Sequence, residues 1–311
     1  MAKKKKWQAR ELTVLLLALC FVFLVSACRV SAENANIQEP GRTGPFGSGS
    51  PEKAVQNDPF SPSPLIDIPA TGSTDITGRS AAKEYDTPGI SKEKSRVAII
   101  IDDMGNHPQI DEKFLDLDLN LTFSFLPYAP FTREQEEKAW ALGHDILVHM
   151  PMEPRDPQWD PGPDALYVKD SIEQLTISVK KNLAMVPHAI GVNNHMGSLF
   201  TEDRLAMHQF LGIVRQKGLF FVDSETSAAS IGMKEAHEMG IKTAKRHVFL
   251  DNVHKQEDIC RQLEVLIRIA RKDGWAIGIG HSNDATLTAL VSSRDTLLES
   301  VRVVGIHELI H

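Results

Sequence analysis

The chain has 311 residues, of which 42% are hydrophobic and 24% charged, so it is long and apolar enough to bury a substantial core. The 41 acidic and 34 basic side chains give a formal net charge of -7, which argues against binding of nucleic acid through a broadly basic surface. Only three cysteines are present, which excludes a disulfide framework and a cysteine-rich zinc module.

Residues 1–28 are typical of an export signal. A basic cluster at Lys3 to Lys6 precedes an apolar run from Leu12 to Val25, and small residues follow that run. The segment Val25–Cys28 resembles a bacterial lipobox, in which lipid on Cys28 would attach the mature protein to a membrane. Cleavage near Val30–Ala32 without lipid, or retention of the apolar run as an anchor, are the open alternatives. We expect an exported protein of the periplasm or cell envelope in each case.

Residues 29–94 form a second compositional segment, which is rich in proline, glycine and serine. It holds eight of the 17 prolines and seven of the 20 glycines of the chain. Such a composition buries too little apolar surface to offset the entropy lost on ordering. We therefore predict a disordered tether between the point of attachment and a folded domain.

Residues 95–311 contain all 12 histidines and form one domain-sized block in which apolar runs alternate with helical patterns. Regular alternation indicates parallel strands with crossover helices, hence an α/β barrel or a doubly wound sheet. Seven or eight units favour a barrel, complete or incomplete. The predicted strands are Val97–Asp102, Leu121–Leu126, Asp145–His149, Ala189–Asn193, Leu219–Asp223, Thr243–Leu250, Trp275–Gly280 and Val301–Ile306. The predicted helices include Arg133–Leu142, Ser171–Met185, Arg204–Lys217, Gln256–Lys272 and Asp284–Glu299.

The carboxyl ends of five predicted strands are unusually polar. In parallel α/β folds this edge of the sheet carries the functional site. We therefore expect three histidines and three aspartates from these ends to meet at one mouth. The candidate residues at the five ends are Asp102, Asp103, His149, Glu153, Asn193, Asn194, His195, Ser198, Asp223 and His281.

Several of these residues also have a purely structural interpretation. Asp102 and Asp103 could cap a helix or occupy a turn, and Asp223 could cap the helix that follows it. A single strand-end histidine such as His149 is commonly a hydrogen-bonded packing residue. Five strand ends with similar chemistry are hard to obtain from independent caps, so the set favours a site. We interpret the other histidines as surface or structural residues: His107, His144, His188, His208, His237, His247, His254, His307 and His311.

A carboxylate with two imidazoles and an open position is a metal-binding set suited to zinc and to other divalent transition metals. A second carboxylate beside the ligand can act as a base, which gives two adjacent aspartates a purpose. His281 could protonate the leaving group from another strand. This chemistry is the hydrolysis of an amide or ester, and we keep Asp223 among the catalytic candidates.

At these residues the sequence resembles the divergent polysaccharide deacetylases, a branch of the polysaccharide deacetylase (carbohydrate esterase) superfamily. The resemblance implies a distorted (β/α) barrel and metal-dependent removal of acetyl groups from N-acetylated sugars. It also implies that Asp102 is the base, Asp103 a metal ligand and His149 the first histidine of a His-x-x-x-His ligand motif. The resemblance extends from about Arg96 to the C-terminus and rests on Ile101–Gly105, His149–Pro154, Asn193–Ser198, Phe220–Ser224 and Val248–Asp251.

The sequence departs from the superfamily pattern in two places. Glu153 replaces the second histidine of the ligand motif, and the Arg-x-Pro-Tyr element is absent, with Asn193–Ser198 in its approximate place. Our hypothesis is that His195 supplies the missing imidazole, so that Asp103, His149 and His195 hold the metal. Glu153 would then support these ligands or act as a fourth. Substrate contacts or supporting contacts are expected at Asn193, Asn194 and Ser198.

The resemblance therefore leads us to expect an envelope hydrolase that uses a divalent metal, zinc foremost, to remove acetyl groups from an acetylated glycan or peptidoglycan-type substrate. The altered motifs leave open an inactive envelope module of the same fold that binds glycan or a protein partner. A metal-dependent amidase acting on peptide cross-links is a further alternative. Retention of both Asp102 and Asp103 favours catalysis, since a pure binder needs no base beside a metal.

Overall fold

The computed structural model describes residues 93–311, and the predicted export signal and tether lie outside the described residues. The described part contains one nine-stranded sheet, with a helix between successive strands except between β6 and β7. The strands are β1 (Arg96–Met104), β2 (Thr122–Phe125), β3 (Asp145–Met152), β4 (Gly191–Met196), β5 (Phe220–Asp223), β6 (Thr243–Lys245), β7 (Val248–Phe249), β8 (Trp275–His281) and β9 (Arg302–Val303). The helices are α2 (Pro108–Leu115), α3 (Thr132–Ala141), α4 (Ile172–Met185), α5 (Arg204–Gln216), α6 (Gly232–Glu238), α7 (Gln256–Asp273) and α8 (Asp284–Ser300), with 3₁₀ helices η1 (Phe200–Glu202) and η2 (Ile306–Leu309).

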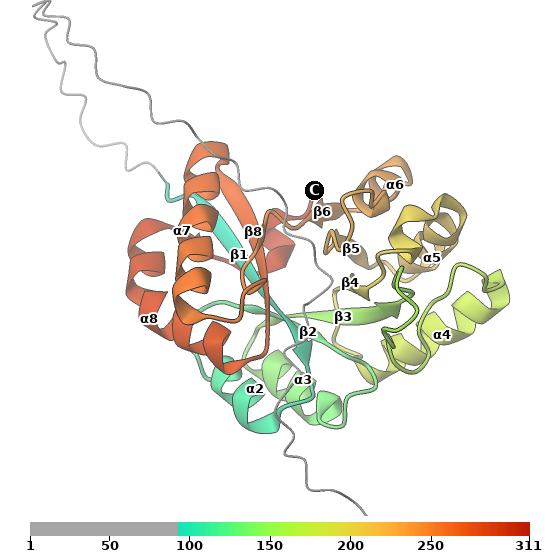
Figure 1. The fold of residues 1–311 in the computed structure, drawn as a ribbon, viewed down its shortest axis with the longest axis horizontal. Coiled ribbons are helices and arrows are strands. Elements are labelled where there is room, and N and C mark those ends of the chain that lie inside the picture. Colours follow the sequence, from blue (N-terminus) through green and yellow to red (C-terminus); the bar gives the residue numbers. More distant parts are fainter. Residues whose placement is uncertain (1–92) are drawn as a thin grey trace, which may run out of the picture. The chain divides into compact units, whose positions relative to one another are not determined.

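The strands are paired in parallel in the order β6-β5-β4-β3-β2-β1-β8-β7, and β9 pairs with the start of β1. Figure 1 shows that the sheet curls, with α7 and α8 packed beside β1 and β8 and with α4 to α6 around β3 to β6. The expected distorted (β/α) barrel of parallel strands is thereby confirmed.

One predicted strand is divided in two. The segment Thr243–Leu250 forms β6, which pairs with β5, and β7, which pairs with β8 at the opposite end of the strand order. The chain changes partner at Arg246 and His247, where Arg246 N donates to Asp223 O and His247 N donates to Ile277 O. This segment therefore spans the two edges of the curled sheet without pairing them, so the barrel is incomplete.

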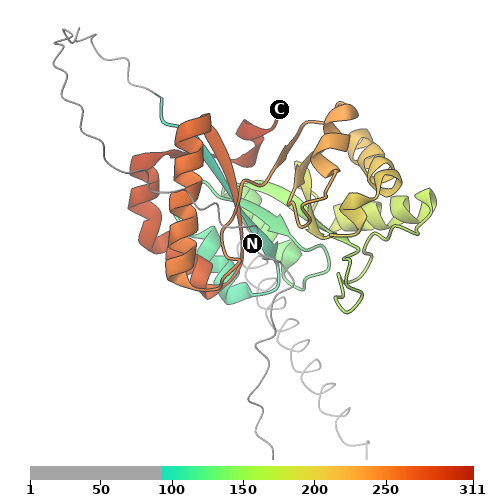
Figure 2. The same cartoon turned by 45° about the horizontal axis from the view of Figure 1, so that its top comes forward.

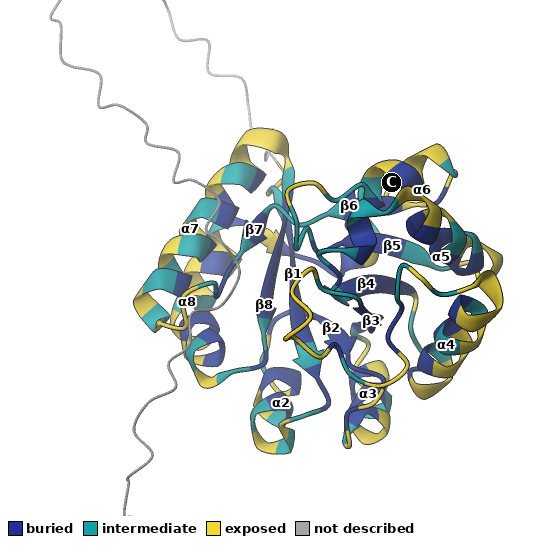
Figure 3. Cartoon of the chain, turned by 45° about the vertical axis from the view of Figure 1, so that its right-hand side comes forward, coloured by how far each residue is buried: buried dark blue, intermediate teal, exposed yellow. Residues whose placement is uncertain are grey.

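The core has an outer and an inner layer because strand side chains alternate between the two faces of the sheet. Val97, Ile99 and Ile101 of β1 pack with the apolar faces of the helices, whereas Ala98 and Ile100 pack inside the curl. Figure 3 shows the strands as buried elements beneath helices whose outer faces are exposed.

The C-terminal segment closes the amino-terminal end of the curl. Ile306 and Leu309 of η2 belong to the inner apolar cluster. Ile306 N donates to Thr122 Oγ1 at 3.0 Å and His307 N donates to Asp145 Oδ2 at 2.9 Å, and these acceptors begin β2 and β3. In Figure 2 this short red segment lies against the strands, close to the C-terminus. The carboxyl ends of the strands remain accessible as a mouth.

Local signals explain where several helices begin and end. Ser171 and Gln174 form a reciprocal capping box at the start of α4, and Asp203 accepts from Ala206 N at the start of α5. Helix α7 ends at Gly274, whose φ of 90° suits glycine. Across residues 93–311, we find no helix with the length and apolar character needed to cross a membrane.

Candidate functional site

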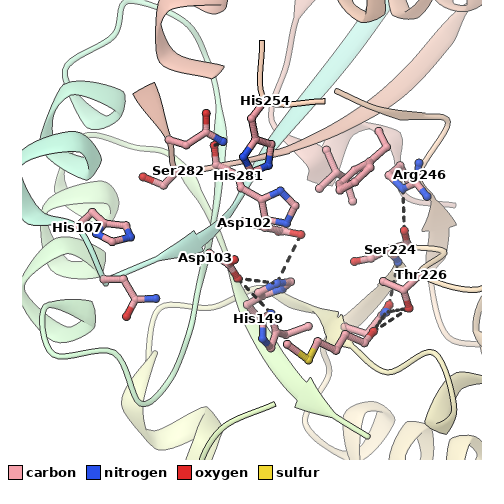
Figure 4. Close-up of a pocket in the computed structure, with 17 residues that line it drawn as sticks. Asp102, Asp103, His107, His149, Ser224, Thr226, Arg246, His254, His281 and Ser282 are labelled. Atoms are coloured by element: carbon pink, nitrogen blue, oxygen red, sulfur yellow. Dashed lines mark hydrogen bonds and ion pairs between the residues drawn. The ribbon is translucent and has the colours of Figure 1, made fainter. Parts of the chain in front are cut away.

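The carboxyl ends of β1, β3, β4 and β8 surround a cavity of about 350 Å³ at the mouth of the barrel (Figure 4). Strand register brings the candidate residues together, since Asp102 of β1 lies opposite His281 of β8 and His149 of β3 lies opposite Asn193 of β4. The cavity is large enough for a sugar residue with its substituents. The predicted meeting of polar strand ends at one mouth therefore has a structural basis in the register.

Three side chains from different strands converge on one point of the cavity. Asp103 Oδ1 lies 3.1 Å from His195 Nδ1 and 3.3 Å from His149 Nε2. One potential ligand atom from each of the three residues lies within 4.8 Å of the others. Asp103 adopts a φ of 60°, a conformation that is uncommon outside glycine and is found at functional sites. The structure thus brings together the three residues predicted to hold a metal.

The surroundings of these three residues fit a divalent cation. Asp103 Oδ1 is buried and accepts no hydrogen bond, although both imidazoles are within 3.3 Å of it. His149 Nδ1 lies 2.9 Å from Asn193 Oδ1, an acceptor, so Nδ1 carries a proton and Nε2 is the ring nitrogen that faces Asp103. Burial raises the pKa of Asp103, but His195 and His149 outweigh it and hold that pKa well below its usual value. Ring nitrogens that face an ionised carboxylate at one point are an arrangement in which a divalent cation can replace the protons between these groups.

Asp102 lies beside this cluster in a distinct environment. It is 2% exposed, and its Oδ1 accepts a 2.8 Å hydrogen bond from Asn193 Nδ2. Its Oδ2 lies 3.7 Å from His149 Nε2. The helix-cap alternative is wrong for both aspartates, since the N-cap of α2 is His107 and the loop amides of Gly105 and His107 donate to Asp111 instead. Asp102 is therefore a buried carboxylate with one oxygen directed by an amide and the other near the cluster.

His281 faces the cluster from β8 and forms an ion pair with Asp251. Its Nδ1 lies 3.1 Å from Asp251 Oδ1, and its backbone N donates to Asp251 Oδ2 at 2.7 Å. Asp251 also accepts from Asn283 Nδ2 and from Thr286 Oγ1, which fixes the carboxylate. Burial lowers the pKa of His281, but Asp251, with smaller contributions from Asp103 and Asp102, raises it to about 10. The imidazole is therefore protonated at neutral pH, with Nε2 free of the Asp251 contact.

Four other candidate residues make their hydrogen bonds away from the point where Asp103, His149 and His195 meet. Glu153 Oε2 accepts from Val168 N at 2.8 Å and so holds the loop after β3. Ser198 Oγ accepts from Arg155 N. Asp223 Oδ2 accepts from Ser230 Oγ and from Met233 N in the first turn of α6, so the alternative of a helix cap describes it. Asn194 does line the cavity, where its Oδ1 accepts from Ser224 N.

The sequence interpretation missed several residues of the cavity wall. His107 and His254 line the cavity, although both were interpreted as surface or structural histidines. Arg246 also lines the cavity. It lies at the bend between β6 and β7, and the prediction of one unbroken strand over Thr243–Leu250 contained no such bend. Asp251 lies two residues after the end of β7, so its place near a strand end was the available signal. For Asn193 the sequence indicated only a substrate contact or a supporting contact. In the structure its side-chain amide contacts Asp102, His149 and Ser124.

The chain is similar to proteins of known sequence and of known structure. The sequence model of the divergent polysaccharide deacetylase family matches residues 99–310. An uncharacterized protein of Haemophilus influenzae is 36% identical over 222 residues, covering 70% of this chain and 77% of the relative. The crystal structure of the uncharacterized protein ATU2773 from Agrobacterium tumefaciens is 28% identical, with a TM-score of 0.67, and covers 71% of this chain and 92% of that one. The peptidoglycan deacetylase PdaC from Bacillus subtilis is 11% identical, with a TM-score of 0.43, over 70% and 90% of the two chains.

Proposed function

Because the chain belongs to the divergent polysaccharide deacetylase family, we propose that it is a metal-dependent hydrolase that removes acetyl groups from an N-acetylated glycan. The observation that carries this proposal is the convergence of Asp103, His149 and His195 beside a second carboxylate, Asp102, and opposite a protonated histidine, His281. Hydrolysis of an acetamide requires a base for water and an acid for the departing amine. The mouth contains both groups.

Asp103, His149 and His195 would hold the metal, and zinc suits two imidazoles and one carboxylate. When bound, such a metal activates water and polarises the acetyl carbonyl. Asn193 contributes by fixing the proton of His149 on Nδ1, which leaves Nε2 to act as a ligand. Glu153 has no part in this set, because its carboxylate fastens the loop at Val168.

The protein residues account for both proton transfers of the hydrolysis. Asp102 accepts the proton of the attacking water, whose oxygen bonds to the acetyl carbon. Asn193 directs Asp102 through the hydrogen bond to Oδ1 and leaves Oδ2 on the side of the cluster. His281 donates its proton to the amide nitrogen as the carbon–nitrogen bond breaks, which releases acetate and a free amine. Asp251 keeps His281 charged before the transfer.

We also propose that the enzyme acts in the cell envelope, anchored through Cys28 or through the apolar run before it. Support for this proposal comes from the sequence of residues 1–28 alone. Cell fractionation of the whole chain beside a variant with Cys28→Ser tests it. Equal release of both proteins from the membrane fraction would argue against a lipid anchor.

Release of acetate tests the enzymatic proposal. The whole chain, loaded with zinc, is incubated with N-acetylglucosamine oligomers and with isolated cell-wall glycan. We expect acetate to form with wild type and to fall by at least about 100-fold with Asp102→Asn, while bound zinc stays constant. Binding of glycan without acetate release under any of these metal and substrate conditions would instead favour an inactive binding module.

A further inference from the structure

Arg246 forms part of the cavity wall away from Asp103 and His149, as Figure 4 shows. Its guanidinium is fixed by two backbone carbonyls: Nε donates to Ser224 O at 2.7 Å and Nη2 donates to Glu225 O at 2.9 Å. The group also lies 5.0 Å from the centre of the Phe249 ring, a distance at which cation–π attraction operates. These contacts orient a planar fork of donors beside the cavity.

In the described part of the chain, the guanidinium of Arg246 has no carboxylate in direct contact: Glu225, Asp223 and Asp102 act on it only from beyond ion-pair distance. Within residues 93–311, no acidic oxygen lies within ion-pair distance of its guanidinium. Glu225, whose backbone carbonyl accepts from Arg246, directs its carboxylate to Lys245 instead, at 2.7 Å. Burial lowers the pKa of Arg246, which reflects the cost of keeping this cation out of water. A fixed, half-buried cation with neutral partners is a site that an anion would stabilise.

Ser224 supplies a second, independent observation on the same wall. The residue is 5% exposed, and its hydroxyl is buried without a hydrogen-bond partner although it lines the cavity. Its backbone is held on both sides, since Ser224 N donates to Asn194 Oδ1 and Ser224 O accepts from Arg246 Nε. A buried polar group in a native protein without a partner is uncommon and costly. A bound ligand with an acceptor atom would satisfy this hydroxyl.

We propose that Arg246 and Ser224 form a carboxylate-binding subsite, so that the enzyme acts on a glycan that carries a carboxylate on or next to the acetylated sugar. This inference rests on the proposed deacetylase function and deepens it by naming a feature of the substrate. The guanidinium hydrogens directed away from the two carbonyls and the Ser224 hydroxyl are the donors. Two carboxylate oxygens match a guanidinium edge and one hydroxyl.

The arrangement of the cavity is consistent with such a substrate. Asp103 and His149 lie on one side of the cavity and Arg246 with Ser224 on another, so one ligand can place its acetamide and its carboxylate at different walls (Figure 4). Asn194 joins the two sides, because it follows Asn193 in β4 and accepts from Ser224 N. A sugar hydroxyl could also contact Arg246, but it would leave the guanidinium without an anion in direct contact.

A pair of matched ligands tests the subsite by binding. The probes are a disaccharide of N-acetylglucosamine and N-acetylmuramic acid, which carries one carboxylate, and its methyl ester, which lacks the charge. Both are titrated calorimetrically into the zinc-loaded whole chain with Asp102→Asn, so that neither is hydrolysed. We expect the acid to bind about 10- to 100-fold more tightly than the ester, as a charge-assisted bidentate contact implies.

Three further substitutions in this background locate the effect. Arg246→Met should abolish the preference for the acid, and Ser224→Ala should reduce it by about 5- to 10-fold while keeping the backbone carbonyl that orients Arg246. Lys245→Met is the matched control, because it removes a neighbouring positive charge that is paired with Glu225, and it should retain the preference. Thermal unfolding of each variant establishes that it is folded.

The remaining outcomes contradict the subsite. Equal affinity for acid and ester, no measurable binding of either, or an equal loss of preference in Lys245→Met and Arg246→Met would each overturn it. Acetate release from neutral oligomers is measured separately with the chain that retains Asp102. Acetate release without a preference for the acid would contradict only the proposed subsite. A preference for the acid without acetate release removes the deacetylase function and leaves a binding site for anionic glycans.

Discussion

Replacement of Asp251 by Asn removes the charge of this side chain and keeps its shape. The Asp251 carboxylate is fully buried and accepts hydrogen bonds from His281 N, His281 Nδ1, Asn283 Nδ2 and Thr286 Oγ1. Asn has nearly the same size but no charge, so the ion pair with His281 is lost. We expect the folded protein to be less stable, and we expect the loss to depend on pH in a direction fixed by His281.

The magnitude follows from the pKa of His281, which is raised from 6.5 to about 10. At about 1.4 kcal/mol for each tenfold change in proton affinity, this interval corresponds to about 5 kcal/mol. Asp251 contributes only part of it, because Asp102 and Asp103 also raise this pKa and the His281 side chain is 29% exposed. We therefore expect about 3 kcal/mol from the pair. This stabilisation is complete from about pH 5, where Asp251 is ionised in both states, to pH 6.5. It disappears as the pH rises through about 10, because the folded state holds the His281 proton more tightly than the unfolded state.

Urea unfolding of the metal-free chain at a series of pH values measures this effect. The free energy of unfolding of wild type should exceed that of Asp251→Asn most between about pH 5 and 6.5, and the difference should narrow by about 3 kcal/mol as the pH rises to about 10.5. In the background of His281→Gln the narrowing should vanish, since the titrating partner is absent. A stability difference that is constant across this range, or that widens with pH, would refute the ion pair as the cause.

Two further substitutions have defined outcomes. Asn193→Leu removes the acceptor for His149 Nδ1 and the donor to Asp102, so calorimetry should show zinc affinity falling about 10- to 100-fold, and undiminished affinity would contradict the orienting role. Gly105→Ala should lower the unfolding free energy by about 2–4 kcal/mol, because Gly105 has a φ of 103° and an added Cβ would collide with Thr132 Oγ1. Gly143→Ala, at a φ of 84° with open space around it, is the matched control and should cost about 1 kcal/mol, so equal losses in urea unfolding would argue against the collision.

Much of the fold was predictable because its strands are buried on both faces and joined by amphipathic helices. Continuous apolar runs such as Val97–Ile101 identify parallel strands, and the polar residue that ends each run marks the mouth. The meeting of Asp103, His149 and His195 was predictable because the parallel strands β1, β3 and β4 end at the same edge of the sheet. Whether these residues bind metal stays a prediction.

The features that escaped prediction depend on contacts between distant segments. Nothing in the local pattern of Thr243–Leu250 shows that it must pair with β5 first and β8 next, and the bend at Arg246 results from that requirement. Asp223 resembles the other strand-end carboxylates in sequence. It lies where α6 begins, however, and its Oδ2 accepts a hydrogen bond from the amide of Met233. Glu153 occupies the position of a ligand in the sequence motif, but its Oε2 accepts a hydrogen bond from the backbone amide of Val168.

Metal content tests the account most directly. The whole chain is equilibrated with zinc, freed of excess metal and analysed for elements, in parallel with Asp103→Ala, His149→Ala, His195→Ala and Glu153→Ala. We predict about one equivalent of zinc in wild type and in Glu153→Ala, because Glu153 contacts the loop at Val168, and loss of zinc in the other three variants. Retention of zinc by His195→Ala together with its loss from Glu153→Ala would contradict the assigned ligands. Absence of zinc and of other divalent metals from wild type would contradict the hydrolytic mechanism itself.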